Sequence, residues 1–128
     1  MAAFDAQLLA EQLGQLGRDL QEEVAELGRL EESCVDAEAD YRALQEHHED
    51  MLASAFLKAT GSNADARKAE ARLMSADSRI AAEVAWKAWS RLKGQLRVQQ
   101  ASLSALHRRC DIGRSLLSRE KALISLGE

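Results

Sequence analysis

Residues 58–65 read KATGSNAD and interrupt a chain that otherwise consists almost entirely of helix-forming residues. Glycine adopts the left-handed backbone conformation that commonly ends a helix, so a helix is predicted to stop near Thr60 and Gly61. The side chain of Ser62 or Asn63 can then cap a new helix. We therefore expect two long helical segments joined at this break.

Before the break, apolar residues recur at steps of three and four. The series is Leu13, Leu16, Leu20, Val24, Leu27, Leu30, Cys34, Ala37, Tyr41, Leu44, His48, Met51 and Ala55. This spacing predicts a coiled-coil seam on one long helix over residues 1–60. Gly14, Gly17 and Gly28 each weaken a helix by about 1 kcal/mol relative to alanine. Residues 1–30 are therefore either the start of this helix or a separate, frayed segment.

After the break, residues 61–77 hold a short amphipathic stretch, Ala64–Met74, with Ser75 or Asp77 as the candidate cap of a last helix over residues 78–126. The second seam consists of Ala85, Trp89, Leu92, Leu96, Gln99, Leu103, Leu106, Cys110, Gly113 and Leu117, with Ile124 in phase. Matched seams joined by one break predict an all-α, antiparallel, coiled-coil-like helical hairpin that forms one domain. The expected register places Tyr41 near Leu103, Cys34 near Cys110, and His48 in a layer next to Gln99.

Composition supports extended helices. Proline is absent and aromatic residues make up only 4% of the chain, so leucine and alanine must fill the seams. The main seam residues are Leu27, Leu30, Tyr41, Leu44, Trp89, Leu92, Leu96, Leu103 and Leu106. Other apolar residues fall outside the seams, namely Leu9, Leu52, Phe56, Trp86, Val98, Ile112, Leu116 and Leu123. Because two helices cannot cover all of these, we expect further burial through the short middle helix or through self-association, with a homo-oligomer favoured.

Targeting signals are not apparent. The N-terminal stretch lacks a basic region and is interrupted by Asp5 and Glu11, which argues against a signal peptide. No apolar run is long enough for a membrane span. Cys34 and Cys110 lie far apart, without metal-ligand or redox spacing. These features predict a cytoplasmic protein with no membrane partner.

Few residues have the type and spacing that catalysis or metal binding requires. In the run Glu46–Asp50, the adjacent His47 and His48 point about 100° apart on a helix, so they do not form a metal-binding pair. Cys110 lies among basic residues but in the seam, which indicates a packing role. There is no partnered base and no glycine-rich phosphate loop. We expect no catalytic residues, metal, cofactor or small-molecule substrate, and hence no enzyme.

Charge divides the chain. Residues 1–57 carry fourteen acids against three bases, whereas residues 84–121 carry nine bases against two acids. Arg97, Arg108 and Arg119 recur every eleven residues and so return to nearly the same helix face. Such a row can track a phosphate backbone, and Trp86 and Trp89, one turn apart beside Lys87 and Arg91, can add a stacking platform for unpaired bases. The candidate nucleic-acid-binding residues are Trp86, Lys87, Arg91, Lys93, Arg97, Arg108, Arg109, Arg114 and Arg119. Alternatively, acids of the first helix neutralise these bases across the hairpin.

Three stretches carry a resemblance: FLKATGSNADARKAEARL (56–73), AWKAWSRLKGQLR (85–97) and LSALHRRCDIGRSLLSREKAL (103–123). Over about residues 41–126 the chain resembles small all-helical proteins of tailed bacteriophages, and its plan is similar to that of UvsY-type recombination mediators. The resemblance implies an oligomer in the host cytoplasm that binds single-stranded DNA and helps to load a recombinase or annealing protein. The positions carried over are the basic ones of the last helix from Lys87 to Arg114. The acidic first helix departs from a simple DNA binder.

Two functions are therefore expected from the sequence. The first is a non-enzymatic accessory protein of phage-type DNA recombination that holds single-stranded DNA on its basic C-terminal helix. The second is a structural or inhibitory protein–protein interaction module that docks through its helical seams and binds no nucleic acid. They differ in whether the basic row faces solvent or the acidic first helix.

Overall fold

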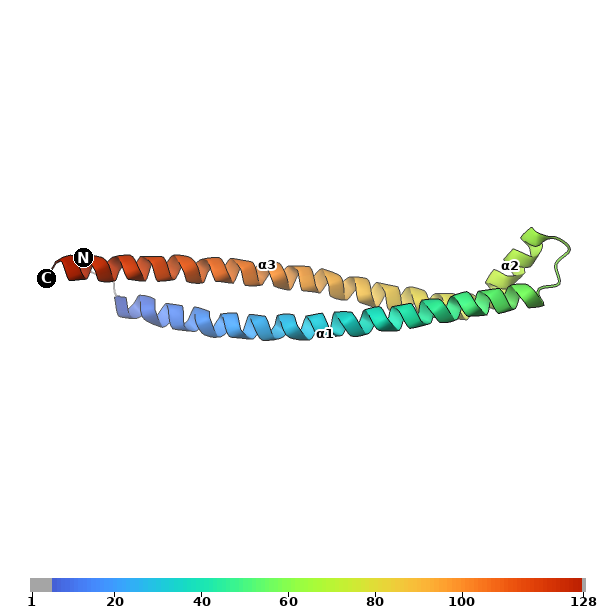
Figure 1. The fold of residues 1–128 in the computed structure, drawn as a ribbon, viewed down its shortest axis with the longest axis horizontal. Coiled ribbons are helices and arrows are strands. Elements are labelled where there is room, and N and C mark those ends of the chain that lie inside the picture. Colours follow the sequence, from blue (N-terminus) through green and yellow to red (C-terminus); the bar gives the residue numbers. More distant parts are fainter. Residues whose placement is uncertain (1–5, 128) are drawn as a thin grey trace. The chain divides into compact units, whose positions relative to one another are not determined.

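Three helices make up residues 6–127, the part of the chain that the computed structural model describes (Figure 1). They are α1 (Ala6–Lys58), α2 (Ala64–Met74) and α3 (Ala76–Leu126), and no strand occurs within that range. The all-α prediction, the break and the short middle helix are thus confirmed. Residues 1–5, which belong to the segment expected to fray, lie outside the described range.

The chain divides into two compact units. Unit 1 comprises residues 1–29 together with residues 96–128, and unit 2 comprises residues 30–95. The described part of the predicted N-terminal segment, residues 6–29, is helical and continuous with the rest of α1.

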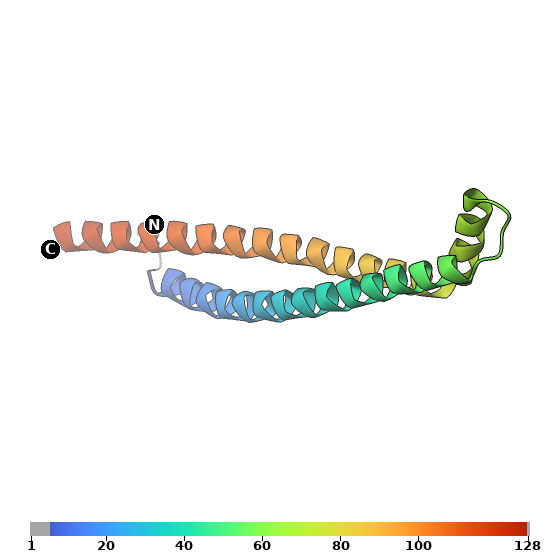
Figure 2. The same ribbon diagram turned by 45° about the vertical axis from the view of Figure 1, so that its right-hand side comes forward.

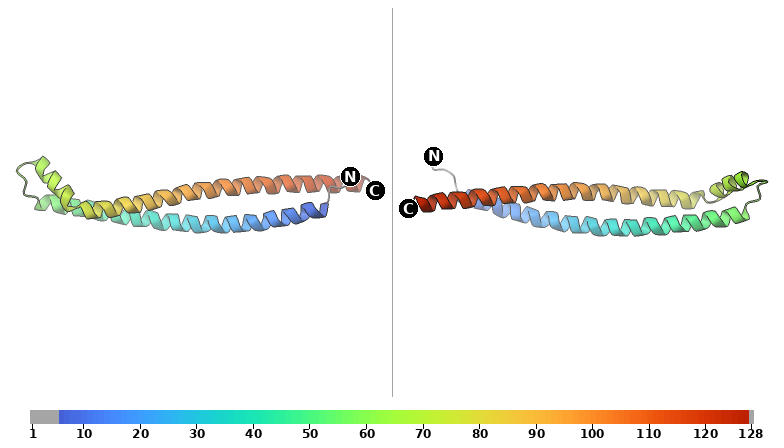
Figure 3. Two further views of the ribbon diagram at one scale, coloured as in Figure 1. Left: turned by 180° about the vertical axis from the view of Figure 1, so that it is seen from behind. Right: turned by 45° about the horizontal axis from the view of Figure 1, so that its top comes forward.

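In unit 1, the first part of α1 packs antiparallel to the last part of α3. Leu13 lies against Gly113. Ten residues further along α1, Glu23 accepts hydrogen bonds from the side chains of Gln99 and Ser102 on α3. The partner number falls as the α1 number rises, which defines the antiparallel direction. Both views in Figure 3 show these two segments side by side.

In unit 2, the second part of α1 packs against α2 and the start of α3. The rings of Tyr41 and Trp89 stack with their centroids 5.6 Å apart. Seven residues later on α1, the Nδ1 atom of His48 lies 2.9 Å from the hydroxyl of Ser78. The short helix α2 crosses the end of α1 at an angle, as Figure 2 shows.

The register expected from the sequence is wrong. Tyr41 stacks on Trp89, which precedes the expected neighbour Leu103 by fourteen residues, or about 21 Å of helix. Likewise, His48 and Gln99 do not share a layer, because His48 pairs with Ser78 within unit 2 and Gln99 pairs with Glu23 within unit 1. The expected pair Cys34 and Cys110 is also split between the units. A shift of two heptads leaves the apolar pattern unchanged, so the pattern alone does not fix the register.

The connection between α1 and α2 is held by side-chain hydrogen bonds. Asn63 caps α2, as predicted, by accepting a hydrogen bond from the backbone N–H of Ala66 at 2.8 Å. The carboxylate of Glu70 accepts hydrogen bonds from the backbone N–H groups of Thr60 and Gly61, at 3.1 and 3.2 Å. These bonds satisfy polar groups that would otherwise have no partner beyond the end of α1.

Gly61 is required for a reason other than the one predicted. No glycine among residues 6–127 has a positive φ, so the expected left-handed cap is not formed. A Cβ atom at Gly61 would instead lie 2.9 Å from the Cβ of Ala66 and 3.0 Å from the backbone nitrogen of Arg67. The glycine permits the connection to pass close to the first turn of α2.

Helices α2 and α3 are separated by one residue, Ser75. Its buried hydroxyl donates a hydrogen bond to the carbonyl of Ala71 at 2.8 Å, within the preceding helix. Its own carbonyl accepts the hydroxyl of Ser78 at 2.9 Å and the backbone N–H of Arg79 at 3.1 Å. Ser75 is thus the C-cap residue of α2, and its side chain donates to carbonyls of α2 instead of capping α3 as predicted.

Buried residues are small, which fits the shallow core that packed helix pairs provide. The buried apolar residues are Cys34, Ala55, Ala71, Ala82 and Cys110. The nine leucine and aromatic residues named as the main seam are each half-buried. The apolar residues predicted to fall outside the seams on α3 are exposed, with Val98 at 71% and Ile112 at 61%. The helices therefore leave apolar surface uncovered.

Replacement of single glycines should have opposite effects on stability. A Cβ atom at Gly28 would meet nothing within 4 Å beyond its own stretch of helix, so Gly28→Ala should stabilise the fold by about 1 kcal/mol through helix propensity. Gly61→Ala should destabilise it by roughly 1–3 kcal/mol, because the methyl group meets the backbone of α2. Urea unfolding followed by far-UV circular dichroism measures both. A shift of the same sign for both variants would contradict the packing described at Gly61.

Candidate nucleic-acid interface

The C-terminal part of α3 in unit 1 carries an exposed set of arginines. All five predicted positions are exposed: Arg97, Arg108, Arg109, Arg114 and Arg119. Arg114 lies 3.9 Å from Asp111 one turn away, and both side chains remain largely in solvent. The other four form no ion pair with any of residues 6–127. These arginines remain open to an anionic ligand.

The position of the arginine row follows from helical geometry. The side chain of Cys110 is buried, so its direction marks the face of α3 that packs on α1. Arg108 precedes Cys110 by two residues and therefore points about 200° away around the helix. Arg97 and Arg119, eleven residues to either side, each deviate from Arg108 by about 20°. The row thus lies on nearly the opposite side of α3 from its contact with α1.

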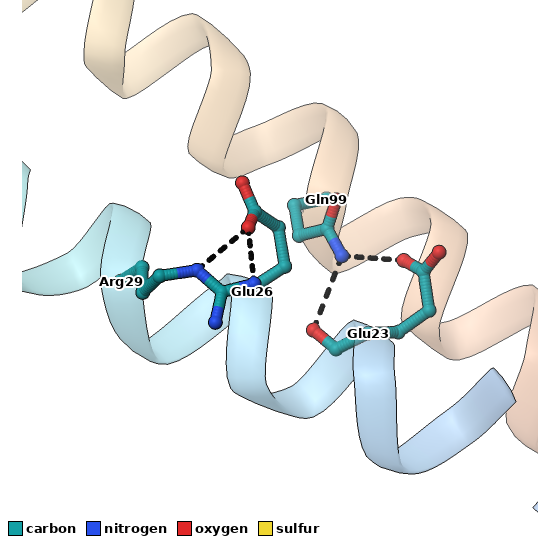
Figure 4. Close-up of polar contacts among 4 residues, drawn as sticks. All are labelled: Glu23, Glu26, Arg29 and Gln99. Carbon is teal, nitrogen blue, oxygen red and sulfur yellow. Dashed lines mark hydrogen bonds and ion pairs between the residues drawn. The ribbon is translucent and has the colours of Figure 1, made fainter. Parts of the chain in front are cut away.

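The acids of α1 do not neutralise this row through ion pairs. Within the described range every ion pair joins residues of one helix, for example Arg29 to Glu26 at 2.6 Å. Where the two helices of unit 1 meet, Glu23 accepts from the neutral amide of Gln99, as Figure 4 shows beside the Glu26–Arg29 pair. The acid of α1 that contacts α3 in unit 1, Glu23, therefore pairs with neutral hydrogen-bond donors, and no ion pair joins the two helices among the described residues.

In unit 2, Trp89 serves packing. One face of its ring stacks on Tyr41 with an interplanar angle of 23°. The ammonium group of Lys93 lies 3.8 Å from the ring centroid, which is favourable for a cation–π contact. Lys93 is half-buried and differs in this respect from the other predicted basic positions. It is engaged with Trp89 and is the least available of the candidate phosphate ligands.

Trp86 has a different environment. It is 49% exposed, and it lines an open groove of about 380 Å³ together with Tyr41, Gln45 and His48. The neighbouring cations Lys87 and Arg91 are exposed. Trp86 and Trp89 therefore do not form a joint platform, and Trp86 alone offers an accessible aromatic surface next to free cations.

The histidine and cysteine side chains of the described range form no metal-binding arrangement. No group of three or more His, Cys, Asp or Glu side chains among residues 6–127 is placed to hold a metal ion. His47 is exposed, and the ring of His48 is paired with Ser78. Cys34 and Cys110 are buried free thiols.

Two features of unit 2 were not recognised in the sequence. The first is Glu70, which holds the α1–α2 connection. The backbone N–H groups of Thr60 and Gly61 need an acceptor, but nothing in the sequence indicates that Glu70, nine residues beyond Gly61, provides it. The second is a groove between α1 and α2 that involves Leu52 and Phe56. The positions of Leu52 and Phe56 outside the seam were the hint of it.

Comparison of the chain with protein-family models, with curated proteins and with solved structures finds no match. Within the described helices, no segment is both long enough and apolar enough to cross a membrane.

Proposed function

We propose that this protein is a non-enzymatic accessory factor of DNA recombination that binds single-stranded DNA along α3, in the cytoplasm of its host cell. The observation that carries the proposal is the solvent-exposed row of Arg97, Arg108 and Arg119 in unit 1, which no acid of α1 pairs with in the described range. Cations in such a row bind a phosphate backbone by releasing condensed counterions, and no base-specific contact is needed.

The preference for single strands is supported by Trp86. A half-exposed indole can stack on a base only if the base is unpaired, and such stacking is worth roughly 1–3 kcal/mol per base. Lys87 and Arg91 lie beside Trp86 on α3 and provide cations for the adjoining phosphates. Stacking on Trp86 in unit 2 and phosphate contacts along the arginines in unit 1 are each tolerant of base sequence.

The proposed place in recombination rests on the resemblance of residues 41–126 to small all-helical phage proteins and on an overall plan similar to that of UvsY-type recombination mediators. A protein that holds single-stranded DNA without catalytic groups acts by presenting the strand to an enzyme. We propose a recombinase or an annealing protein as that partner. The acidic residues of α1 are available to contact this partner, because none of them forms an ion pair with an arginine of α3 in the described range.

A helical interaction module is the second candidate, and one observation favours it. On α3 in unit 1, Val98, Ile112, Leu116 and Leu123 are between 45% and 71% exposed and fall on one face. An apolar stripe of this kind is suited to another helix. This candidate predicts a defined protein complex and no affinity for nucleic acid.

The two candidates are separated by a binding assay with a fluorescently labelled oligonucleotide. We expect saturable binding of the single strand at low salt and weaker binding of a duplex of the same length, because Trp86 finds no unpaired base in the duplex. Absence of binding to the single strand at low salt would refute the DNA-binding proposal and favour the interaction module.

A further inference from the structure

Unit 2 contains a second groove, away from Trp86, between the end of α1 and α2. It has a volume of about 440 Å³ and is predominantly apolar, with Leu52, Phe56 and Ala71 among its lining residues. Lys68 and Arg72 line it from α2, opposite a single acid, Glu49 of α1. Neither cation forms an ion pair with another residue of the described chain. The groove thus suits an apolar side chain flanked by carboxylates.

Apolar surface near this groove lacks cover. Leu57, in the last turns of α1, is 85% exposed, and Leu73 and Met74 of α2 are 79% and 51% exposed. Large exposed apolar side chains gathered on adjoining elements commonly mark a protein interaction site. The partner must therefore bring apolar area as well as negative charge.

The chain itself carries a segment with these properties. Val35 on α1 is 66% exposed, although its neighbour Cys34 is buried. Glu31 and Glu32 lie one turn before Val35 on the helix, are exposed, and have no ion-pair partner in the described range. Val84 and Val98 on α3 are similarly exposed, at 61% and 71%, but Val84 adjoins Glu83, which pairs with Arg79, and Val98 adjoins Arg97. Of these three most exposed valines, only Val35 lies near acids that form no ion pair in the described range, and their negative charge complements Lys68 and Arg72.

We infer that the groove of one copy binds the Val35 segment of α1 of a second copy, with Glu31 and Glu32 of that copy facing Lys68 and Arg72. Because the groove and the Val35 segment are different surfaces, the contact is either made twice in a two-fold dimer or repeated head-to-tail in a ring or a longer array. Burial of the valine and of Phe56 supplies the attraction, and the charges fix orientation and partner choice. This inference does not rest on nucleic-acid binding.

The test is a charge exchange followed by the mass in solution. We expect the unaltered chain to have a mass above the 14.1 kDa of one copy in light scattering after size-exclusion chromatography. Lys68→Glu with Arg72→Glu should weaken self-association by roughly tenfold or more, and so should Glu31→Lys with Glu32→Lys. All four substitutions in one chain should restore association. A chain of single-copy mass across a concentration series, or a fourfold variant that remains dissociated, would overturn the inference.

A second pair of variants tests whether a loss of association is caused by misfolding. Val35→Asp changes an exposed side chain and should abolish association with unchanged far-UV circular dichroism. Val98→Asp makes the same chemical change at a position of similar exposure on α3 and should leave the mass unchanged. Equal effects of the two variants, or none from Val35→Asp, would exclude the Val35 segment as the occupant of the groove.

Discussion

Reversal of Arg97 and Arg108 to glutamate should weaken the binding of single-stranded DNA roughly 100-fold at low salt, at about 1.4 kcal/mol for each position. Both side chains are exposed on the face of α3 that points away from α1, so the fold should be unaffected. Each substitution removes a phosphate contact and adds repulsion. Fluorescence anisotropy of a labelled oligonucleotide measures the change.

The matched control reverses two arginines of α1. Arg29→Glu with Arg42→Glu changes the net charge of the chain by the same amount, but these residues are paired with Glu26 and Glu38 of their own helix. This variant should bind within a few-fold of the unaltered chain. If both double variants lose affinity equally, the effect is one of net charge, and α3 is not the binding surface.

Replacement of Trp86 by alanine should lower the affinity for single-stranded DNA by roughly 5- to 150-fold, which corresponds to 1–3 kcal/mol of lost stacking. The affinity for a duplex should hardly change, because a paired base does not stack on the indole. Trp86→Phe retains an aromatic face and should recover most of the loss. Anisotropy with the two substrates distinguishes these cases.

Tryptophan fluorescence provides an independent measurement of the same contact. Binding of the oligonucleotide should quench the emission of Trp86, which is half exposed, while Trp89 is covered by Tyr41 and Lys93. The Trp86→Phe variant should therefore bind DNA with little quenching. If the oligonucleotide binds the Trp86→Phe variant and quenches its tryptophan emission as much as that of the unaltered chain, Trp86 is not in the interface.

Much of the fold was predictable because helix signals are local. The absence of proline and the abundance of alanine and leucine predict helix almost everywhere, and Asn63 marked the start of α2. The exposure of Val98 and Ile112 followed from their positions outside the seam. These predictions depend on residues within one or two turns of each other, where sequence and structure are closely linked.

The pairing of the helices was not predictable in the same way. Both seams repeat every seven residues, so the Tyr41–Trp89 contact and the expected Tyr41–Leu103 contact satisfy the same pattern. The choice between them depends on where the chain reverses, which is set by the close packing at Gly61 and by Glu70. Neither interaction is visible in the periodicity.

The separation of charge was also left open by the sequence. Counting acids and bases suggested neutralisation of α3 by α1 as readily as an exposed cationic surface. In unit 1 the helices instead meet through the small residue Gly113 and through Gln99, which takes Glu23 as its acceptor. Arg97, Arg108 and Arg119 lie on the side of α3 that faces away from α1, so they form no ion pairs with α1 across the seam. The arginine row is therefore available for phosphates.

The salt dependence of oligonucleotide binding tests the central claim most directly. If Arg97, Arg108 and Arg119 each contact a phosphate, the logarithm of the binding constant should fall against the logarithm of salt concentration with a slope of about −2, at about −0.7 per contact. The Arg97→Glu, Arg108→Glu variant should show a correspondingly shallower slope. Binding of the unaltered chain that does not change between low and high salt would contradict the account.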